Sequence, residues 1–158
     1  MIDINSATKR LHFHEGLRLK PYYCIRGKQT IGVGHNLDAN PITEEEAKVL
    51  GDWHHGITTE GAYYLLRRDI RRVVKECKEN ILFFNHLDDE RQYALVDMAF
   101  NLGINGLLRF KNMLGYLSQC MYQHAATECL NSNYAKQTGK RAQRIAHLIK
   151  TGKWQITV

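Results

Sequence analysis

The residues best suited to chemistry lie near the start of the chain, in the stretch HEGLRLKPYYCIRGKQTIGVGH, residues 14–35. It contains a carboxylic acid, Glu15, and further along a thiol, Cys24, and a hydroxyl, Thr30. Burial disfavours the charged form of a carboxylic acid, so a partly desolvated glutamate can serve as a general acid. A carboxyl group that faces small polar groups across a cleft is typical of a hydrolase that positions water. This stretch therefore indicates a hydrolytic site.

Each of these residues also has a structural interpretation. Glu15 can be a surface glutamate at a helix end, and Cys24 can be a small buried hydrophobic residue. If the sequence IRGKQ, 25–29, forms a turn, Cys24 and Thr30 lie on neighbouring strands and a thiol meets a hydroxyl. From these residues alone, the catalytic and the structural interpretations both stay open. The elements predicted around the stretch help to decide between them.

The segment 17–37 has the pattern of a small antiparallel sheet. Aromatic and β-branched residues alternate there with Pro21 and with glycines, which predicts two or three strands. Ahead of it, Ser6 is the expected N-cap of a short helix over about 5–13, interrupted by Gly16. Glu15 is then expected at the frayed end of this helix.

Helical patterns fill the rest of the chain. A capping-box sequence at Thr43 predicts a helix that stops near Gly51, and a second cap at Thr58 predicts a longer helix to about Lys78. Another helix is expected to begin with acidic residues and to end at Gly103. Further helices are expected at about 107–118, 121–131 and 141–150.

Together these elements predict an α+β fold in a single domain, 1–158, mostly helical with a small antiparallel sheet. We expect a β-containing N-terminal lobe and a helical C-terminal lobe with a cleft between them, and helix 5–13 packed on the C-terminal lobe. The expected boundaries are about 13–57 for the first lobe, 58–78 for the connecting helix and 79–158 for the second lobe.

Charge limits the class of partner. The formal net charge of +6 and pI near 9.2 favour encounters with nucleic acid, anionic lipid or an acidic cell wall. A basic surface without such a partner is the alternative. The basic run LLRRDIRRVVKECK, 65–78, can likewise bind phosphate groups, or it can form a solvated helix face.

The cysteines and histidines show no metal-site spacing, so we expect no metal and no cofactor. The cysteines are interpreted as reduced thiols. The first residues, MIDINSATKRLHFHEG, contain no apolar run long enough for a signal peptide or membrane span. If the protein acts outside the cytoplasm, another factor is expected to release it.

At this point a resemblance becomes specific. EGLRLKPYYCIRGKQTIGVGHNL resembles the active-site segment of the phage-type lysozymes, the endolysins of glycoside hydrolase family 24, whose pattern is E-G-x-R-L-x-x-Y-x-D-x-x-G-x-x-T-I-G-x-G-H. ITTEGAYYLLRRDI resembles the connecting helix of the family, ALVDMAFNLG its core helix, and NYAKQTGKRAQRI its C-terminal part. The similarity thus covers nearly the whole chain in the right order.

The resemblance implies a lysozyme that hydrolyses the β-1,4 bond between N-acetylmuramic acid and N-acetylglucosamine in peptidoglycan. Glu15 is the implied general acid, Thr30 holds the attacking water, and His35 and Asp69 form an ion pair. The remaining matched site residues are Tyr22, Phe100, Asn101, Gln137 and Arg141. It also implies a monomer without a nucleic-acid partner or stable membrane anchor, which a separate holin-type pore releases from the host bacterial cytoplasm to the periplasmic wall.

Cys24 departs from the family pattern, which has aspartate at this position. A thiol with an ordinary pKa of about 8.5 is neutral, but nearby cationic side chains favour thiolate. We expect the Cys24 thiolate to act as a water-orienting base or as a nucleophile. Two alternatives follow from the departure: a lytic transglycosylase, which needs only the glutamate, and a wall-binding module of weak catalytic power.

Overall fold

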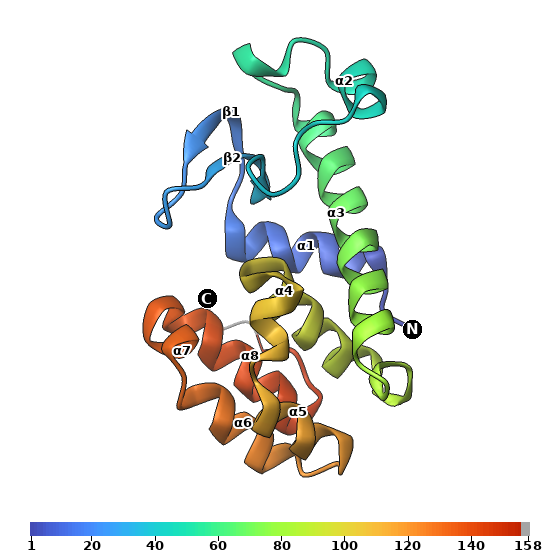
Figure 1. Cartoon of the computed structure of the whole chain (residues 1–158), viewed down its shortest axis with the longest axis vertical. Coiled ribbons are helices and arrows are strands. Elements are labelled where there is room, and N and C mark those ends of the chain that lie inside the picture. Colours follow the sequence, from blue (N-terminus) through green and yellow to red (C-terminus); the bar gives the residue numbers. More distant parts are fainter. Residues whose placement is uncertain (156–158) are drawn as a thin grey trace. The chain divides into compact units, whose positions relative to one another are not determined.

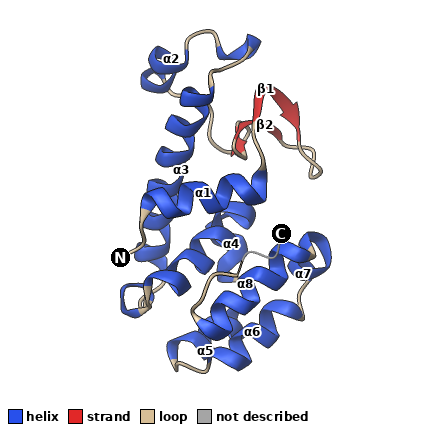
Figure 2. Cartoon of the chain, turned by 180° about the vertical axis from the view of Figure 1, so that it is seen from behind, coloured by secondary structure: helices blue, strands red, loops and turns tan. Residues whose placement is uncertain are grey.

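The computed structural model describes residues 1–155 and shows a mostly helical chain with one small sheet (Figures 1 and 2). This confirms the predicted α+β class. Two short 3₁₀ turns, Trp53–His55 and Phe84–His86, join some of the elements. The elements, in chain order, are α1 (Ile4–Glu15), β1 (Arg18–Tyr23), β2 (Gln29–Gly32), β3 (His35–Asn36), α2 (Glu44–Leu50), α3 (Thr59–Asn80), α4 (Asp89–Leu108), α5 (Lys111–Ser118), α6 (Tyr122–Leu130), α7 (Asn133–Thr138) and α8 (Lys140–Thr151).

The chain divides into two compact units. The N-terminal unit is Ile4–Arg72, and the C-terminal unit combines Met1–Asp3 with the chain from Val73 onward. Helix α3 runs through the boundary, so it belongs to both units. The lobes expected from the sequence divide the chain differently, and that division stays a prediction.

The sheet of the N-terminal unit is a three-stranded antiparallel meander in the order β1-β2-β3. Tyr22 pairs with Thr30, and Ile31 pairs with His35. The turn between β1 and β2 falls where IRGKQ predicted it. Gly27 N–H donates to the Cys24 carbonyl at 2.8 Å, and Cys24 N–H donates to the Lys28 carbonyl at 2.9 Å. Gly27 has φ +75°, the left-handed conformation that closes a three-residue hairpin loop.

The first helix begins earlier than expected. Helix α1 starts at Ile4, so Ser6 lies inside it and the prediction of Ser6 as N-cap is wrong. A serine caps a helix only when its own backbone is non-helical and stands just before the first turn. Here the chain is already helical at Ser6. The helix extends to Glu15, and Gly16, at φ +75°, ends it.

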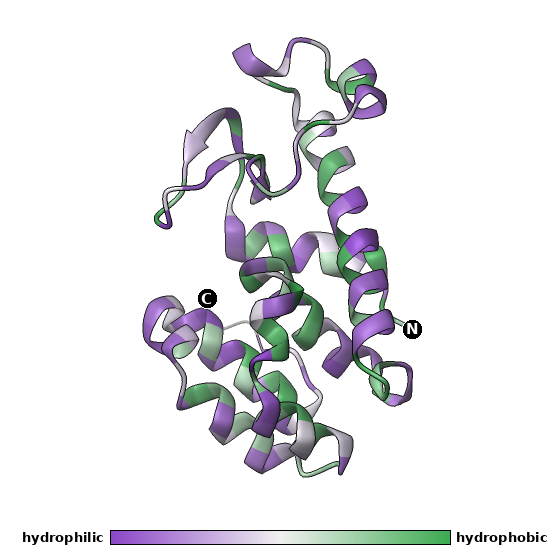
Figure 3. Cartoon of the chain, viewed as in Figure 1, coloured by the Kyte–Doolittle hydropathy of each residue, from purple (hydrophilic) through white to green (hydrophobic). Residues whose placement is uncertain are grey.

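Both predicted caps at the next helices are confirmed. The Thr43 hydroxyl accepts from Glu46 N–H at 3.1 Å while the Glu46 carboxylate accepts from Thr43 N–H at 3.0 Å, a complete capping box for α2. Thr58 Oγ1 accepts from Gly61 N–H at 3.0 Å at the start of α3. Hydrophobic and hydrophilic residues alternate along α3, as an amphipathic helix requires (Figure 3).

The core of the N-terminal unit joins the sheet to α3. Five buried residues form one cluster, and partly buried side chains that include Trp53 and Tyr64 pack against it. This packing holds β2 and β3 on the first turns of α3, where apolar residues at helical spacing face the sheet. The cluster consists of Ile31, Leu37, Ile57, Ala62 and Leu65.

In the C-terminal unit, α4 is interrupted at Gly103, whose φ of +76° and ψ of +160° are non-helical. The predicted stop at Gly103 is therefore confirmed, and a further short helical segment follows it. Helix α5 begins at Lys111, later than the expected 107. Helix α6 packs against α5 and α8, while α7, which the sequence did not predict, connects α6 to α8.

Candidate active site

Glu15 is the last residue of α1, at the point where the chain enters β1. Its half-buried side chain lies against the backbone of Gly34, in the turn between β2 and β3. A Cβ placed on Gly34 would lie 3.0 Å from Cγ, Cδ and Oε2 of Glu15, and the φ of Gly34 is +64°. A glycine is therefore required here both by the backbone conformation and by the close approach of the carboxyl group.

Cys24 opens the hairpin loop between β1 and β2, and it is partly exposed. Desolvation raises the pKa of the Cys24 thiol, but the backbone amides of Lys28 and Arg26, together with the Thr30 hydroxyl, stabilise the thiolate, and the net effect lowers the pKa below its ordinary value. The turn that forms the loop thus also aims N–H groups at the sulfur. The causes of the lowered pKa are hydrogen bonds and not the cationic side chains expected from the sequence, and the catalytic role of Cys24 stays a prediction.

Thr30 lies on β2 with only 5% of its surface exposed. Its Oγ1 donates to the Lys28 carbonyl at 2.9 Å. The same single proton can be given to the Cys24 sulfur instead, which is the interaction that favours the thiolate. A hydroxyl has one proton and two lone pairs, so it can give its proton to one acceptor and still accept from a water. Cys24 and Thr30 are therefore brought together, as the hairpin predicted.

Tyr22 lies within electrostatic range of both the Glu15 carboxyl group and the Cys24 thiol. Burial raises the pKa of the Tyr22 hydroxyl, and the negative charges of Glu15 and Cys24 raise it further. Both groups therefore act electrostatically on the Tyr22 hydroxyl. Arg18 lies over the Tyr22 ring, with its guanidinium carbon 4.2 Å from the ring centroid. Glu15, Tyr22, Cys24 and Thr30 thus form one polar cluster in the N-terminal unit.

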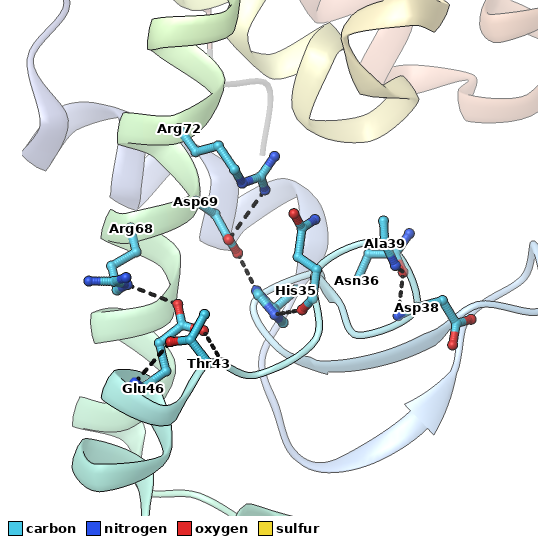
Figure 4. Close-up of polar contacts among 10 residues, drawn as sticks. His35, Asn36, Asp38, Ala39, Thr43, Glu46, Arg68, Asp69 and Arg72 are labelled. Atoms are coloured by element: carbon cyan, nitrogen blue, oxygen red, sulfur yellow. Dashed lines mark hydrogen bonds and ion pairs between the residues drawn. The ribbon is translucent and has the colours of Figure 1, made fainter.

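His35 and Asp69 form a buried pair in the same unit. His35 Nδ1 lies 2.7 Å from Asp69 Oδ2, with the side chains 2% and 5% exposed (Figure 4). Nε2 of His35 lies 2.9 Å from the Asn40 carbonyl. Burial by itself lowers the pKa of His35, but the hydrogen bond and charge of Asp69 and the Asn40 carbonyl outweigh it, so the pKa is raised. The pair fixes β3 to α3.

A second ionic contact on α3 was not foreseen. Arg68 Nε donates to Glu46 Oε2 at 2.8 Å, so the glutamate that completes the capping box also binds α3 (Figure 4). Arg72 pairs with Asp69 Oδ1 at 3.3 Å. These contacts use two arginines of the basic run for internal ion pairs, which favours the structural interpretation of that run over a phosphate-binding one.

Among the matched residues of the C-terminal unit, Arg141 pairs with a buried carboxylate. Its Nε donates to Asp97 Oδ1 at 2.9 Å, and Tyr93 donates to Asp97 Oδ2 at 2.6 Å. Asp97 is fully buried and Arg141 is 9% exposed. Phe100 and Asn101 are half-buried on α4, while Gln137 is exposed on α7.

Comparisons with known proteins assign the chain to a family. A family described as phage lysozyme matches residues 12–150. The chain belongs to the phage lysozyme family. It is therefore a lysozyme-type cell-wall hydrolase, a glycoside hydrolase-type enzyme that acts on peptidoglycan.

Similar proteins come from different sources. The "Probable T4-type lysozyme 2" of Dictyostelium discoideum is 28% identical over 94% of this chain and 96% of its own length. The "Pre-baseplate central spike protein Gp5" of Enterobacteria phage T4 is 31% identical over 93% of this chain but 28% of its own length. An "Endolysin" of Acyrthosiphon pisum secondary endosymbiont phage 1 is 32% identical over 81% of this chain and 77% of its own.

The roles of Asp97 and Tyr93 as partners in the Arg141 contact were not predicted from the sequence. The available signal was an aspartate inside the apolar run ALVDMAF, because a carboxylate at a core position needs a partner. The partner is on α8, far along the chain, and the pattern of α4 alone does not identify it.

The described part of the chain contains no candidate metal-binding site. Across residues 1–155, no group of three or more His, Cys, Asp or Glu side chains has the arrangement to hold a metal ion. All four cysteines are free thiols. Over the same residues, no helix combines the length and apolar character needed to cross a bilayer.

Proposed function

We propose that this lysozyme hydrolyses the β-1,4 bond between N-acetylmuramic acid and N-acetylglucosamine, and that it acts as an endolysin that lyses its bacterial host. The observation that carries the proposal is the cluster of Glu15, Cys24 and Thr30 around Tyr22. It combines a proton donor, a thiol of lowered pKa and a hydroxyl able to hold water. Most glycoside hydrolases use two carboxyl groups, and in this proposal the Cys24 thiolate takes the place of the second one.

Glu15 donates its proton to the glycosidic oxygen as the bond from C1 of the muramic acid to that oxygen breaks. Positive charge then develops on the sugar ring, and the Cys24 thiolate stabilises it. Thr30 holds the water that attacks C1. Cys24 either accepts a proton from this water in a single displacement, or first bonds to C1 and is displaced by water in a second step.

The thiol also supports a second candidate, a lytic transglycosylase. In that reaction the sugar's own 6-hydroxyl attacks C1 and no water enters, so a second acidic group is not needed. The observation in its favour is that Cys24 occupies the position where the family pattern has aspartate. The products differ: hydrolysis gives reducing ends, and transglycosylation gives 1,6-anhydro ends.

Mass spectrometry of the fragments released from purified peptidoglycan tests both reactions. We expect reducing-end products from the unmodified enzyme, their loss in Glu15→Gln, a reduction of about 100-fold or more in Cys24→Ser, and substantial activity in Cys24→Asp. Cys120→Ser is the matched control, because Cys120 is an exposed thiol in the C-terminal unit.

Three results would contradict the hydrolase proposal. Anhydro products that do not depend on Cys24 would identify a transglycosylase. Near-normal hydrolysis by Cys24→Ser would remove the thiolate from the mechanism. Adhesion to the wall with no released fragments would identify a binding module.

The enzyme is further proposed to be a monomer that accumulates in the host bacterial cytoplasm and reaches the wall through a separate holin-type pore. Its similarity to a phage endolysin supports this part of the proposal. Expression in bacteria with and without a co-expressed pore tests it. Turbidity should fall only with the pore, and clearing without it would reject the dependence.

A further inference from the structure

A side-chain contact between α1 and α3 takes no direct part in the proposed reaction. The Tyr63 hydroxyl and Nδ1 of His12 form a hydrogen bond. The two rings meet edge to face, with their centroids 5.5 Å apart and their planes at 67°. Both side chains are half-buried, and both belong to the N-terminal unit. The contact therefore joins the C-terminal part of α1 to the first turns of α3.

This contact holds the turn of α1 that carries Glu15. His12 precedes Glu15 by three residues, so both belong to the last turn of the helix. The His12 carbonyl accepts from Gly16 N–H at 2.8 Å, and this bond closes the turn. Helix ends fray because their last carbonyl groups lack intrahelical donors. An anchor at His12 thus limits the movement of the backbone from which the Glu15 side chain extends.

The residue next to Tyr63 on α3 holds the other side of the Glu15 carboxyl group. That carboxyl group lies against Gly34, in the turn between β2 and β3. A Cβ on Gly32, at the end of β2, would lie 3.3 Å from Cβ of Ala62. Ala62 therefore packs closely on the sheet, while Tyr63 beside it binds α1. The first turns of α3 thus fix both the backbone of Glu15 and the turn that its carboxyl group contacts.

The hydrogen bond is compatible with either charge state of the imidazole. When Nδ1 of His12 carries no proton, the Tyr63 hydroxyl donates to it. When the ring is protonated, Nδ1–H donates to the Tyr63 oxygen instead. A salt bridge would lose its attraction once one partner became neutral, but this pair keeps one hydrogen bond in both states. The contact can therefore hold α1 across the pH range in which histidines titrate.

We infer that His12 and Tyr63 are positioning residues that aim the Glu15 carboxyl group at the glycosidic oxygen. This inference rests on the proposed function and adds the contact that orients its general acid. A displacement of about 1 Å can cost about 100-fold in rate. Loss of the contact should therefore slow proton transfer to the leaving group and leave substrate binding unchanged.

The test compares two substrates that differ in the leaving group. Peptidoglycan strands need a proton on the departing oxygen, whereas a nitrophenyl glycoside of the same disaccharide releases a stable phenolate without one. Tyr63→Phe removes the hydroxyl and keeps the ring. It should lower kcat on the strands by about tenfold, leave KM within about twofold, and change kcat on the nitrophenyl glycoside by less than about twofold. Glu15→Gln should show the same pattern with a larger loss on the strands.

Substitutions of His12 add a rescue. Oδ1 of asparagine and Nδ1 of histidine occupy the same position along the side chain, so His12→Asn keeps an acceptor for Tyr63 and should retain most of the activity on the strands. His12→Leu removes the acceptor and should match Tyr63→Phe.

Tyr116→Phe is the matched control. Tyr116 is another half-buried tyrosine beside a histidine, with its ring centroid 5.2 Å from that of His124 in the C-terminal unit. Its loss of a hydroxyl should leave kcat on both substrates unchanged. Urea unfolding curves show that each variant is folded at the assay temperature.

The outcomes separate the inference from the proposed function. A contact that only stabilises the fold would lower the folded fraction and hence kcat on both substrates alike, and that result in Tyr63→Phe would overturn the inference. Normal hydrolysis of the strands by Tyr63→Phe would overturn it as well. Normal hydrolysis by Glu15→Gln, or no cleavage of either substrate by the unmodified enzyme, would instead reject the proposed function and the inference together.

Discussion

Each unit contains an aspartate buried against a basic side chain, and the two aspartate pairs differ in one respect. Asp69 lies 2.7 Å from His35 in the N-terminal unit, and Asp97 lies 2.9 Å from Arg141 in the C-terminal unit. Both carboxylates accept a second hydrogen bond, Asp69 from Arg72 and Asp97 from Tyr93. Burial and geometry are similar, but the bases are not.

The difference determines how each pair responds to pH. An arginine does not lose its proton in a folded protein, so the Asp97–Arg141 pair stays ionic across neutral and basic pH. A histidine does lose it, and the raised pKa of His35 means that the folded state holds this proton more tightly than the unfolded chain. One unit therefore has a pH-dependent ion pair and the other a permanent one.

The largest expected effect comes from breaking the permanent pair. Asp97→Ala leaves the Arg141 guanidinium buried without its carboxylate and should lower the free energy of unfolding by about 3–5 kcal/mol. Urea titration should show nearly the same loss at pH 6 and pH 9. Asp97→Asn, which keeps an acceptor for Arg141, should lose less. A loss under 1 kcal/mol in Asp97→Ala would mean that the pair is not what stabilises this part of the core.

An intermediate effect with a pH dependence is expected at the other pair. Because the His35 pKa is raised on folding, its contribution is fully present below the unfolded value of about 6.5 and disappears as pH rises through the folded value. Asp69→Asn should therefore cost about 1.5–3 kcal/mol at pH 5.5 and less at pH 9. Unfolding curves at both values, with Asp97→Asn as the pH-independent control, measure this. Equal losses at both values would remove the titrating histidine from the explanation.

The smallest effect is expected at an exposed pair, which tests whether burial is what matters. Lys75 and Glu79 lie 3.9 Å apart on α3 with side chains 77% and 60% exposed. Lys75→Gln should change the free energy of unfolding by no more than about 0.5 kcal/mol, because water screens the pair. Thermal melting against the unmodified protein is sufficient. A loss as large as that of Asp69→Asn would contradict the role given to burial.

Local signals explain what was predictable from the sequence. The capping box at Thr43, the stop at Gly103 and the turn after Cys24 each depend on a few neighbouring residues, and all three are confirmed. Helix α7 was missed because its six residues are too short to show an apolar period, although Ser132 caps it. The N-cap prediction at Ser6 was wrong because a serine near a helix start looks like an N-cap in the sequence whether or not its backbone is helical.

The polar contacts between distant elements were harder to predict. The pairing of His35 with Asp69 was available through the family resemblance, and the pairing of Arg68 with Glu46 was not, although both join α3 to the segment before it. Asp97 shows the same limit, since the spacing within α4 does not indicate that α8 supplies the partner. Such contacts depend on which helix faces meet, and that is a property of the whole fold.

The close approach of Glu15 to Gly34 has a genetic consequence. Every missense change in a glycine codon adds a side chain, and any side chain at position 34 meets both the left-handed backbone and the carboxyl group. Selection for cell-wall hydrolysis should thus tolerate few substitutions at Gly34. The codon for Gly34 is therefore constrained by the side chain that the codon for Glu15 encodes.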